Sequence, residues 1–120
     1  MPQVRDVMTT DLTTIEPGAG IVGAAQRMIA EEKGQLPVVE GGRVLGTLTD
    51  RDIVSRLVAE GHDPQAVNVE DVHTDEPVTI GPDQDVEEAR RLMTQHQVDR
   101  LLVLDDERRL VGIITKADLP

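Results

Sequence analysis

Two short segments of this chain combine a threonine hydroxyl and an aspartate carboxylate at one spacing, Thr49-x-x-Asp52 and Thr115-x-x-Asp118. A carboxylate accepts hydrogen bonds from a vicinal diol, and the start of a helix attracts phosphate. Arg51 and Lys116 lie inside the two segments and offer charge-assisted contacts to an anion. The same spacing is also typical of a helix-capping box, which contributes about 1 kcal/mol to stability. Ligand binding and helix capping are both open for these residues, and the two roles are compatible.

The other chemically active side chains do not form a recognisable site in the sequence. The histidines His62, His73 and His96 lie far apart, and none has the i, i+4 partner typical of a zinc site. The chain has no cysteine, which excludes disulfides, thiolate metal ligands and cysteine nucleophiles. The acidic run at residues 105–107 lacks the spacing and the glycine of a calcium loop. We therefore expect no catalytic residue, no metal, no catalytic cofactor and no enzymatic activity.

The composition disfavours several classes of partner. The 120 residues include 12 basic and 23 acidic ones, a net charge of -11, which repels nucleic-acid phosphates and anionic lipid headgroups. Aromatic residues, the usual stacking platforms for bases, are absent from the sequence. A small anionic ligand stays compatible, since a few local cations override the overall field. No apolar stretch approaches a membrane span or a signal peptide, so we expect a cytoplasmic protein that binds neither nucleic acid nor membrane.

The chain contains two copies of one sequence unit. The segment from Val4 to Asp52 recurs from Val69 to Asp118, with an offset of 65 that becomes 66 after an insertion near residues 108–109. A unit of about sixty residues buries too little surface to be stable alone, so the copies should pack together. We place the copies at residues 1–62 and 63–120, and we expect the last helix of the second copy to be truncated.

Hydrophobic periodicity predicts the order β-α-β-β-α in each copy. In the first copy we expect strands at 12–15, 36–39 and 44–48, a helix at 21–29 with Ile29 on its buried face, and a helix at 53–58. In the second copy we expect strands at 77–80, 101–104 and 110–114, and a helix from about residue 82 with His96 on its buried face. The apolar strands suggest sheets covered on both faces. The expected fold class is α/β (α+β), with two pseudo-symmetric units packed sheet to sheet.

The order of these motifs resembles a known family. The segments Val-x-Asp-Val-Met-Thr from residue 4, Leu-Pro-Val-Val from residue 36 and Gly-x-Leu-Thr-Asp-Arg-Asp-Ile-Val from residue 46 are similar to a cystathionine-β-synthase (CBS) domain. The second copy resembles it too, and together they look like a stand-alone tandem CBS protein, a Bateman module, over essentially the whole chain. The resemblance implies an adenosine-containing ligand (AMP, ADP, ATP or a related compound) in clefts between the units, and a homodimer paired through the helices.

The resemblance also implies which residues bind the ligand. In the family, the aspartate of the motif binds the ribose hydroxyls and the threonine lies near the ribose and phosphate, which here assigns Asp52 and Asp118. The other expected ligand-binding residues, including the basic residues near the motifs, are Thr14, Ile15, Leu36, Pro37, Thr49, Arg51, Thr79, Ile80, Arg100, Leu101, Leu102, Thr115 and Lys116. The two clefts are not equivalent, because the second copy has Arg100-Leu101-Leu102 for Gln35-Leu36-Pro37 and Lys116-Ala117 for Asp50-Arg51.

Two functions are open at this point. The leading hypothesis is a regulatory module that binds an adenosine-containing ligand and signals by a change in conformation or in the dimer. The alternative is a ligand-free dimeric scaffold in which Thr49 and Asp52 only cap a helix. The sequence names no protein target for either function.

Overall fold

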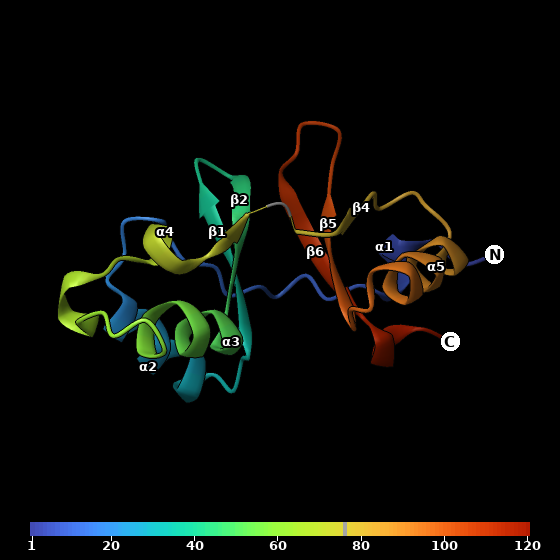
Figure 1. The fold of residues 1–120 in the computed structure, drawn as a ribbon. Coiled ribbons are helices and arrows are strands. Elements are labelled where there is room, and N and C mark those ends of the chain that lie inside the picture. The colour runs from blue at the N-terminus through green and yellow to red at the C-terminus, as the bar shows by residue number, and fades with distance from the viewer. Residues whose placement is uncertain (76) are drawn as a thin grey trace. The chain divides into compact units, whose positions relative to one another are not determined.

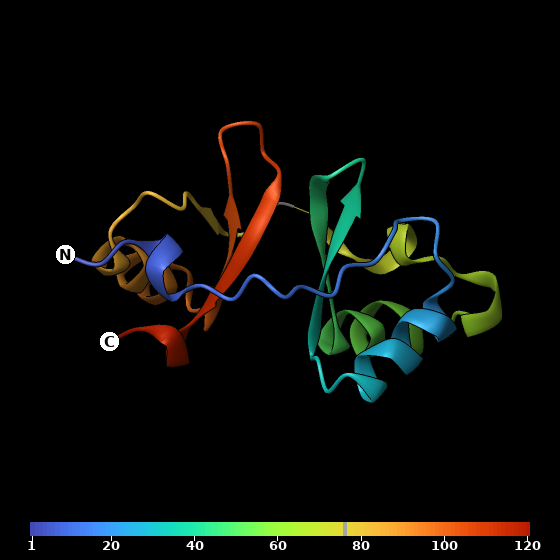
Figure 2. The same ribbon diagram turned by 180° about the vertical axis from the view of Figure 1, so that it is seen from behind.

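The computed structural model describes residues 1–75 and 77–120. The fold is mixed α/β, as the sequence predicted, with two three-stranded sheets and helices. The chain forms two compact units, one made of Met1–Leu12 with Pro77–Pro120 and the other of Thr13–Glu76 (Figures 1 and 2). These units differ from the sequence copies 1–62 and 63–120, because the opening segment of each copy belongs to the unit that holds the sheet of the other copy.

The unit Thr13–Glu76 is built on an antiparallel sheet in the order β1-β2-β3. Its elements are α2 (Ile21–Ala30), β1 (Gln35–Glu40), β2 (Arg43–Thr49), α3 (Asp50–Asp52), a π-helix (Ile53–Val58), a 3₁₀-helix (Pro64–Ala66), α4 (Val69–Val72) and β3 (Thr74–Asp75). The predicted helices at 21–29 and 53–58 and the strands at 36–39 and 44–48 are confirmed. In place of the strand expected at 12–15, a single bridge joins Ile15 to Val38.

One face of α2 packs in the core of this unit. The helix residues that are buried are Ile21, Ala24 and Met28, at the i, i+3 and i+7 spacing of one helical face. They lie in one cluster with Leu36 of β1 and Leu48 of β2. Ile29, which we expected on the same face, is 79% exposed. That expectation was wrong because the buried face ends at Met28, and residues 29–31 at the end of the helix are exposed.

The other unit joins residues 1–12 to 77–120. Its elements are α1 (Val4–Val7), β4 (Thr79–Ile80), α5 (Val86–His96), β5 (Arg100–Leu104), β6 (Leu110–Thr115) and a 3₁₀-helix (Lys116–Asp118). β4 pairs in parallel with β5, and β5 pairs antiparallel with β6. α1 lies beside α5 in both views (Figures 1 and 2), and the N–H of Val4 donates to the carbonyl of Gln84 at 2.8 Å.

α5 differs from the prediction in its first residue and in the exposure of His96. The helix begins at Val86 instead of near residue 82, because the Asp85 side chain caps it by accepting the N–H of Glu87 at 3.1 Å. His96 was expected on the buried face but is exposed. That expectation was wrong because His96 lies in the last turn, directly before Gln97, whose φ of 56° ends the helix.

A glycine in the middle of β2 and another in β6 let a neighbouring segment approach closely. A Cβ atom on Gly46 would overlap the carbonyl oxygen of Thr74 and lie 2.6 Å from Cδ2 of His73. At Gly112, the matched position of the other unit, a Cβ atom would lie 2.5 Å from Sδ of Met8 and 3.1 Å from the carbonyl oxygen of Thr9. The missing side chain at each position therefore permits the opening segment of the other copy to lie against the strand.

Candidate functional site

The first Thr-x-x-Asp motif forms a capping box at the start of α3. The N–H of Thr49 donates to Oδ2 of Asp52 at 2.9 Å, and the N–H of Asp52 donates to Oγ1 of Thr49 at 3.0 Å. The second carboxylate oxygen, Oδ1, accepts the hydroxyl of Thr74 at 2.7 Å. Asp52 is only 6% exposed, and both oxygens of its buried carboxylate accept hydrogen bonds from the protein. The capping role predicted for this motif is confirmed, and Asp52 also ties β3 to α3.

The threonine and aspartate of the second motif are also hydrogen-bonded to each other, but this aspartate is more exposed than Asp52. The N–H and the hydroxyl of Thr115 both donate to Oδ2 of Asp118, at 2.8 Å and 3.0 Å. Asp118 is half-buried, and within residues 1–75 and 77–120 its Oδ1 accepts no hydrogen bond. Thr9, which occupies the position matched to Thr74, pairs through its backbone with Ile113 instead. One oxygen of the Asp118 carboxylate is therefore available to a ligand.

A hollow of about 480 Å³ lies beside this second motif. The residues that line it are Asp99, Arg100, Thr115, Lys116 and Ala117. The register of β5 and β6 places Arg100 directly opposite Thr115. The N–H of Lys116 donates to the carbonyl of Asp99 at 2.7 Å, which fixes the turn out of β6. The strand pairing thus brings two cations, a hydroxyl and a carboxylate to one hollow.

The residues that the resemblance places around an adenine lie in two groups, one in each unit. The N–H of Ile15 donates to the carbonyl of Pro37 at 2.9 Å, which brings residues 14–15 beside residues 36–37. Thr79 pairs with Leu102 in the ladder between β4 and β5. The members of the set whose side chains are buried are Ile15, Leu36, Pro37, Ile80, Leu101 and Leu102. Thr14 and Thr79 are half-buried, and Arg51 of the first motif is exposed.

Sequence reasoning missed two residues of these sites. Thr74 binds the Asp52 carboxylate from 22 positions away, and Asp99 lines the hollow beside Arg100. Neither residue lies inside a Thr-x-x-Asp motif. The repeat carried a partial signal, because Thr9 and Thr74 are matched positions with the same side chain, but only the fold reveals what each hydroxyl contacts.

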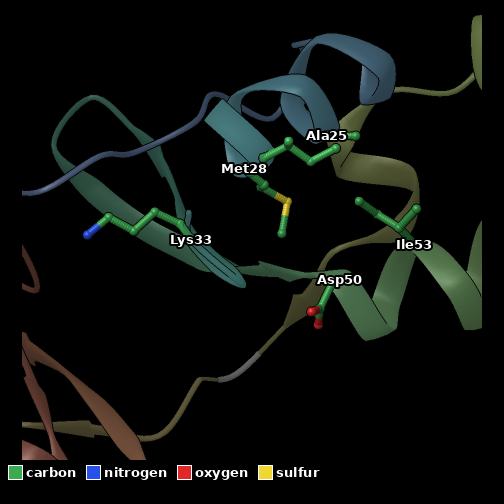
Figure 3. Close-up of a pocket in the computed structure, with 6 residues that line it drawn as sticks. Ala25, Met28, Lys33, Asp50 and Ile53 are labelled. Carbon is green, nitrogen blue, oxygen red and sulfur yellow. The ribbon is translucent and has the colours of Figure 1, made fainter. Parts of the chain in front are cut away.

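Each unit also has a hollow against its long helix, and the two are lined by matched positions. The first measures about 230 Å³ and is lined by Ala25, Met28, Ile29, Lys33, Asp50 and Ile53. Figure 3 shows Met28 and Ile53 pointing toward the same space, while the ammonium of Lys33 extends away. The second measures about 70 Å³ and is lined by Arg90, Met93, Thr94, Val98, Lys116 and Leu119. The first is the more apolar and the second is partly charged.

The resolved pKa shifts belong to exposed ion pairs on the helices. A hydrogen bond from the Thr13 hydroxyl, and then one from Arg27, lowers the pKa of the Glu31 carboxyl. A hydrogen bond from Arg91 lowers the pKa of Glu88, and the same pairing raises the pKa of Arg91. These groups lie at the surface, so the shifts reflect local helix contacts and do not mark a reactive group.

The part of the chain that the structure describes has neither a metal-binding cluster nor a membrane-spanning helix. Among those residues, no group of three or more His, Asp or Glu side chains is placed to hold a metal ion. No helix there is long and apolar enough to cross a bilayer. The hollow beside Thr115 is lined by two cations, a carboxylate and a hydroxyl, groups that can bind a small polar ligand.

Comparison with known sequences gives consistent matches over the whole chain. The family model described as CBS domain matches twice, at residues 4–59 and 69–119. The CBS domain-containing protein YhcV of Bacillus subtilis is 43% identical over 119 residues, covering 99% of this chain and 84% of that protein. Hypoxic response protein 1 of Mycobacterium tuberculosis is 35% identical over 120 residues, covering 99% and 83%. A homoserine O-acetyltransferase of Methanococcoides burtonii is 38% identical over 117 residues, but these cover only 23% of the enzyme.

Solved structures match the fold equally well. Hypoxic Response Protein I, solved with two coordinated zinc ions, has a TM-score of 0.85 at 33% identity and covers 98% of this chain and 95% of that one. The CBS domain pair of protein MJ0100, in complex with 5′-methylthioadenosine and S-adenosyl-L-methionine, has a TM-score of 0.83 at 27% identity, covering 98% and 95%. CBSX2 in complex with AMP has a TM-score of 0.86 at 23% identity, covering 99% and 93%, a likeness of fold alone.

Proposed function

Because this chain belongs to the CBS domain family, we propose that it is a regulatory module that binds an adenosine-containing ligand at its second Thr-x-x-Asp motif. The ligand class includes AMP, ADP, ATP and related adenosine compounds. Ligand binding changes the conformation of the module or the arrangement of a homodimer, and this change is the signal. The module acts in the cytoplasm. The adenosine compounds bound by the MJ0100 pair, at 27% identity, support this class of ligand.

The observation that carries the proposal is the half-free carboxylate of Asp118, which follows directly in the chain on three residues that line a hollow, Thr115, Lys116 and Ala117. An ionised carboxylate is an acceptor only, with two oxygens that each take hydrogen bonds. Oδ2 of Asp118 is held by Thr115, while Oδ1 has no donor among the described residues. A ribose presents two neighbouring hydroxyl donors, which match a fixed carboxylate with an open oxygen. The hollow of about 480 Å³ is lined by Thr115, the hydrogen-bond partner of Asp118, and supplies room at this motif.

Asp52 of the first motif offers less to a ligand. Its Oδ1 accepts the Thr74 hydroxyl at 2.7 Å and its Oδ2 accepts the N–H of Thr49 at 2.9 Å. A ribose at this motif would have to displace the Thr74 hydroxyl or share the carboxylate with it, and Asp52 is 6% exposed. We therefore assign the ligand to the second motif and a bracing role to the first.

The proposed function is binding without catalysis. The relatives YhcV and hypoxic response protein 1 are covered over 84% and 83% of their lengths, so the shared module makes up most of each. In the homoserine O-acetyltransferase the shared module is 23% of the enzyme. The module is thus a part that occurs both with and without an enzyme attached.

Thermal unfolding with a panel of adenosine compounds tests the proposal. A ligand present at about a hundred times its Kd stabilises the folded state by about 2.7 kcal/mol. We expect at least one of adenosine, AMP, ADP, ATP and 5′-methylthioadenosine to raise the Tm of the wild type. Asp118→Asn should abolish the shift, since an amide nitrogen replaces the open acceptor. Asp106→Asn makes the same charge change at an exposed turn residue and should keep it. A flat panel for the wild type would refute ligand binding.

A second candidate function, a ligand-free dimeric scaffold, rests on apolar side chains exposed on helices. Ile29, Val54 and Val58 are 79%, 61% and 65% exposed. Exposed apolar groups of this size favour association with another surface. Sedimentation of Val54→Lys should show a smaller species than the wild type if these residues pair two copies. A flat ligand panel together with this change in size would favour the scaffold.

A further inference from the structure

One hydroxyl of the chain itself occupies the carboxylate of the first motif, whereas its counterpart leaves the second motif open. Thr74 and Thr9 stand at matched positions of the two copies. The Thr74 hydroxyl donates to Oδ1 of Asp52 at 2.7 Å. Thr9 instead pairs with Ile113 through its backbone, and among the described residues its hydroxyl donates no hydrogen bond to Asp118. The same side chain therefore closes one carboxylate and leaves the other available.

Neighbouring contacts hold Thr74 in this place. β3 is paired with β2, where the absence of a side chain at Gly46 leaves room for the Thr74 backbone. Nη1 of Arg56, four residues after Asp52 in the chain, donates to the carbonyl of His73 at 3.0 Å. Two side chains from one helical segment thus hold two consecutive residues, one by its backbone and one by its hydroxyl. Strand pairing and Arg56 therefore position the Thr74 hydroxyl on the carboxylate.

A ligand hydroxyl and the Thr74 hydroxyl compete for the same acceptor. Both are O–H donors, and an ionised carboxylate accepts from either. Asp52 is 6% exposed, so a ligand reaches its Oδ1 only after the Thr74 side chain has moved. A donor in the same chain also acts at a high effective concentration, which a free ligand has to exceed. The competition at the first motif therefore favours Thr74.

We infer that Thr74 restricts the module to one ligand site per chain, because its hydroxyl takes the place of a ligand hydroxyl on Asp52. The inference rests on the proposed function and adds that the first motif is a second site for the same class of ligand, occupied by the protein itself. Loss of the Thr74 side chain opens this site. A Thr74 that only braced β3 would alter the stability of the fold and leave the number of sites unchanged.

Calorimetric titration with AMP counts the sites in the wild type and in variants of residue 74. Thr74→Ala removes the hydroxyl together with the methyl group of the side chain, which makes room for a donor from a ligand. Thr74→Ser keeps the hydroxyl and is the matched control at the same position. Thr9→Ala removes the matched side chain, which is exposed. Asp118→Asn disables the second motif, so binding to the double variant with Thr74→Ala reports the first motif.

We expect one AMP per chain for the wild type, Thr74→Ser and Thr9→Ala, and two for Thr74→Ala. Asp118→Asn should bind AMP at least about tenfold more weakly than the wild type, because displacement of a hydrogen bond to a carboxylate lowers affinity by this much or more. Addition of Thr74→Ala to Asp118→Asn should restore the affinity to within about tenfold of the wild type. A third change, Asp52→Asn, should remove binding again.

A folded Thr74→Ala variant that binds one AMP per chain, a second site in Thr74→Ser, or two sites in the wild type would each overturn the inference and leave the proposed function standing. If neither the wild type nor Thr74→Ala binds AMP, the inference falls, and the thermal panel of adenosine compounds separately decides the proposed function. Arg56→Gln serves if Thr74→Ala does not fold. It releases the carbonyl of His73 from an exposed side chain and should add a second, weaker site. A single site in Arg56→Gln would then overturn the inference.

Discussion

Removal of the Asp52 carboxylate should destabilise the fold far more than removal of its counterpart Asp118. In Asp52→Ala, the N–H of Thr49 loses an acceptor at 2.9 Å and the hydroxyl of Thr74 loses one at 2.7 Å. A helix cap contributes about 1 kcal/mol, and a hydrogen bond to a charged group about 1.5–3 kcal/mol. Because Asp52 is 6% exposed, water replaces these contacts poorly. We expect a loss of about 3 kcal/mol in the free energy of unfolding.

Asp118→Ala is the matched control, since Asp118 caps a helix but, among the described residues, accepts no hydrogen bond from a distant segment of the kind that Thr74 gives to Asp52. Its loss should be about 1 kcal/mol, which leaves a difference of about 2 kcal/mol, or roughly 10 °C in Tm for a domain of this size. Urea denaturation followed by circular dichroism measures both variants. A cycle with Thr74→Val should give a coupling free energy of about 1–2 kcal/mol between residues 52 and 74. Equal losses for the two alanine variants, or zero coupling, would refute the bracing role.

Further predictions concern the glycines and the surface charges. Gly46→Ala should destabilise the fold by about 1–3 kcal/mol, because its Cβ meets the Thr74 backbone. Gly112→Ala should destabilise it less, because its Cβ first meets the flexible end of the Met8 side chain. Urea midpoints that rank the two variants the other way would contradict this. Because the pKa of Glu31 is lowered in the folded state, its ionised carboxylate stabilises the fold at a pH above the ordinary glutamate pKa. This stabilisation is lost as the pH falls through the lowered pKa. Thr13→Val should raise the Glu31 pKa in an NMR titration, and an unchanged value would show that the Thr13 hydroxyl has no influence.

Most of the elements were predictable from the sequence because local periodicity determines them. Helix 21–29 and the strands at 36–39 and 44–48 follow from apolar spacing, and the structure has them at nearly these bounds. Ile29 and His96 were misplaced because spacing alone does not fix where the buried face of a helix ends. In place of the strand expected at 12–15, the structure has a single bridge between Ile15 and Val38.

The candidate site was predictable only in part. The two motifs are visible in the sequence, and their capping geometry is what Thr-x-x-Asp spacing predicts. The difference between them depends on contacts from other segments. Thr74 reaches Asp52 because β3 joins the sheet of the first copy, whereas among the described residues the hydroxyl of the matched Thr9 forms no hydrogen bond to Asp118. The position of Arg100 opposite Thr115 requires the register of two strands, which periodicity does not give.

An NMR titration of ¹⁵N-labelled protein with AMP tests whether the second Thr-x-x-Asp motif binds the ligand. We expect the largest backbone amide shifts at four residues that line the hollow of the second motif: Arg100, Thr115, Lys116 and Ala117. The amide resonances of Thr49 to Asp52 should shift less, because the hydrogen bonds of Asp52 to Thr49 and Thr74 stay formed. Shifts confined to residues 49–52, or a spectrum that AMP leaves unchanged at saturating concentration, would contradict this expectation.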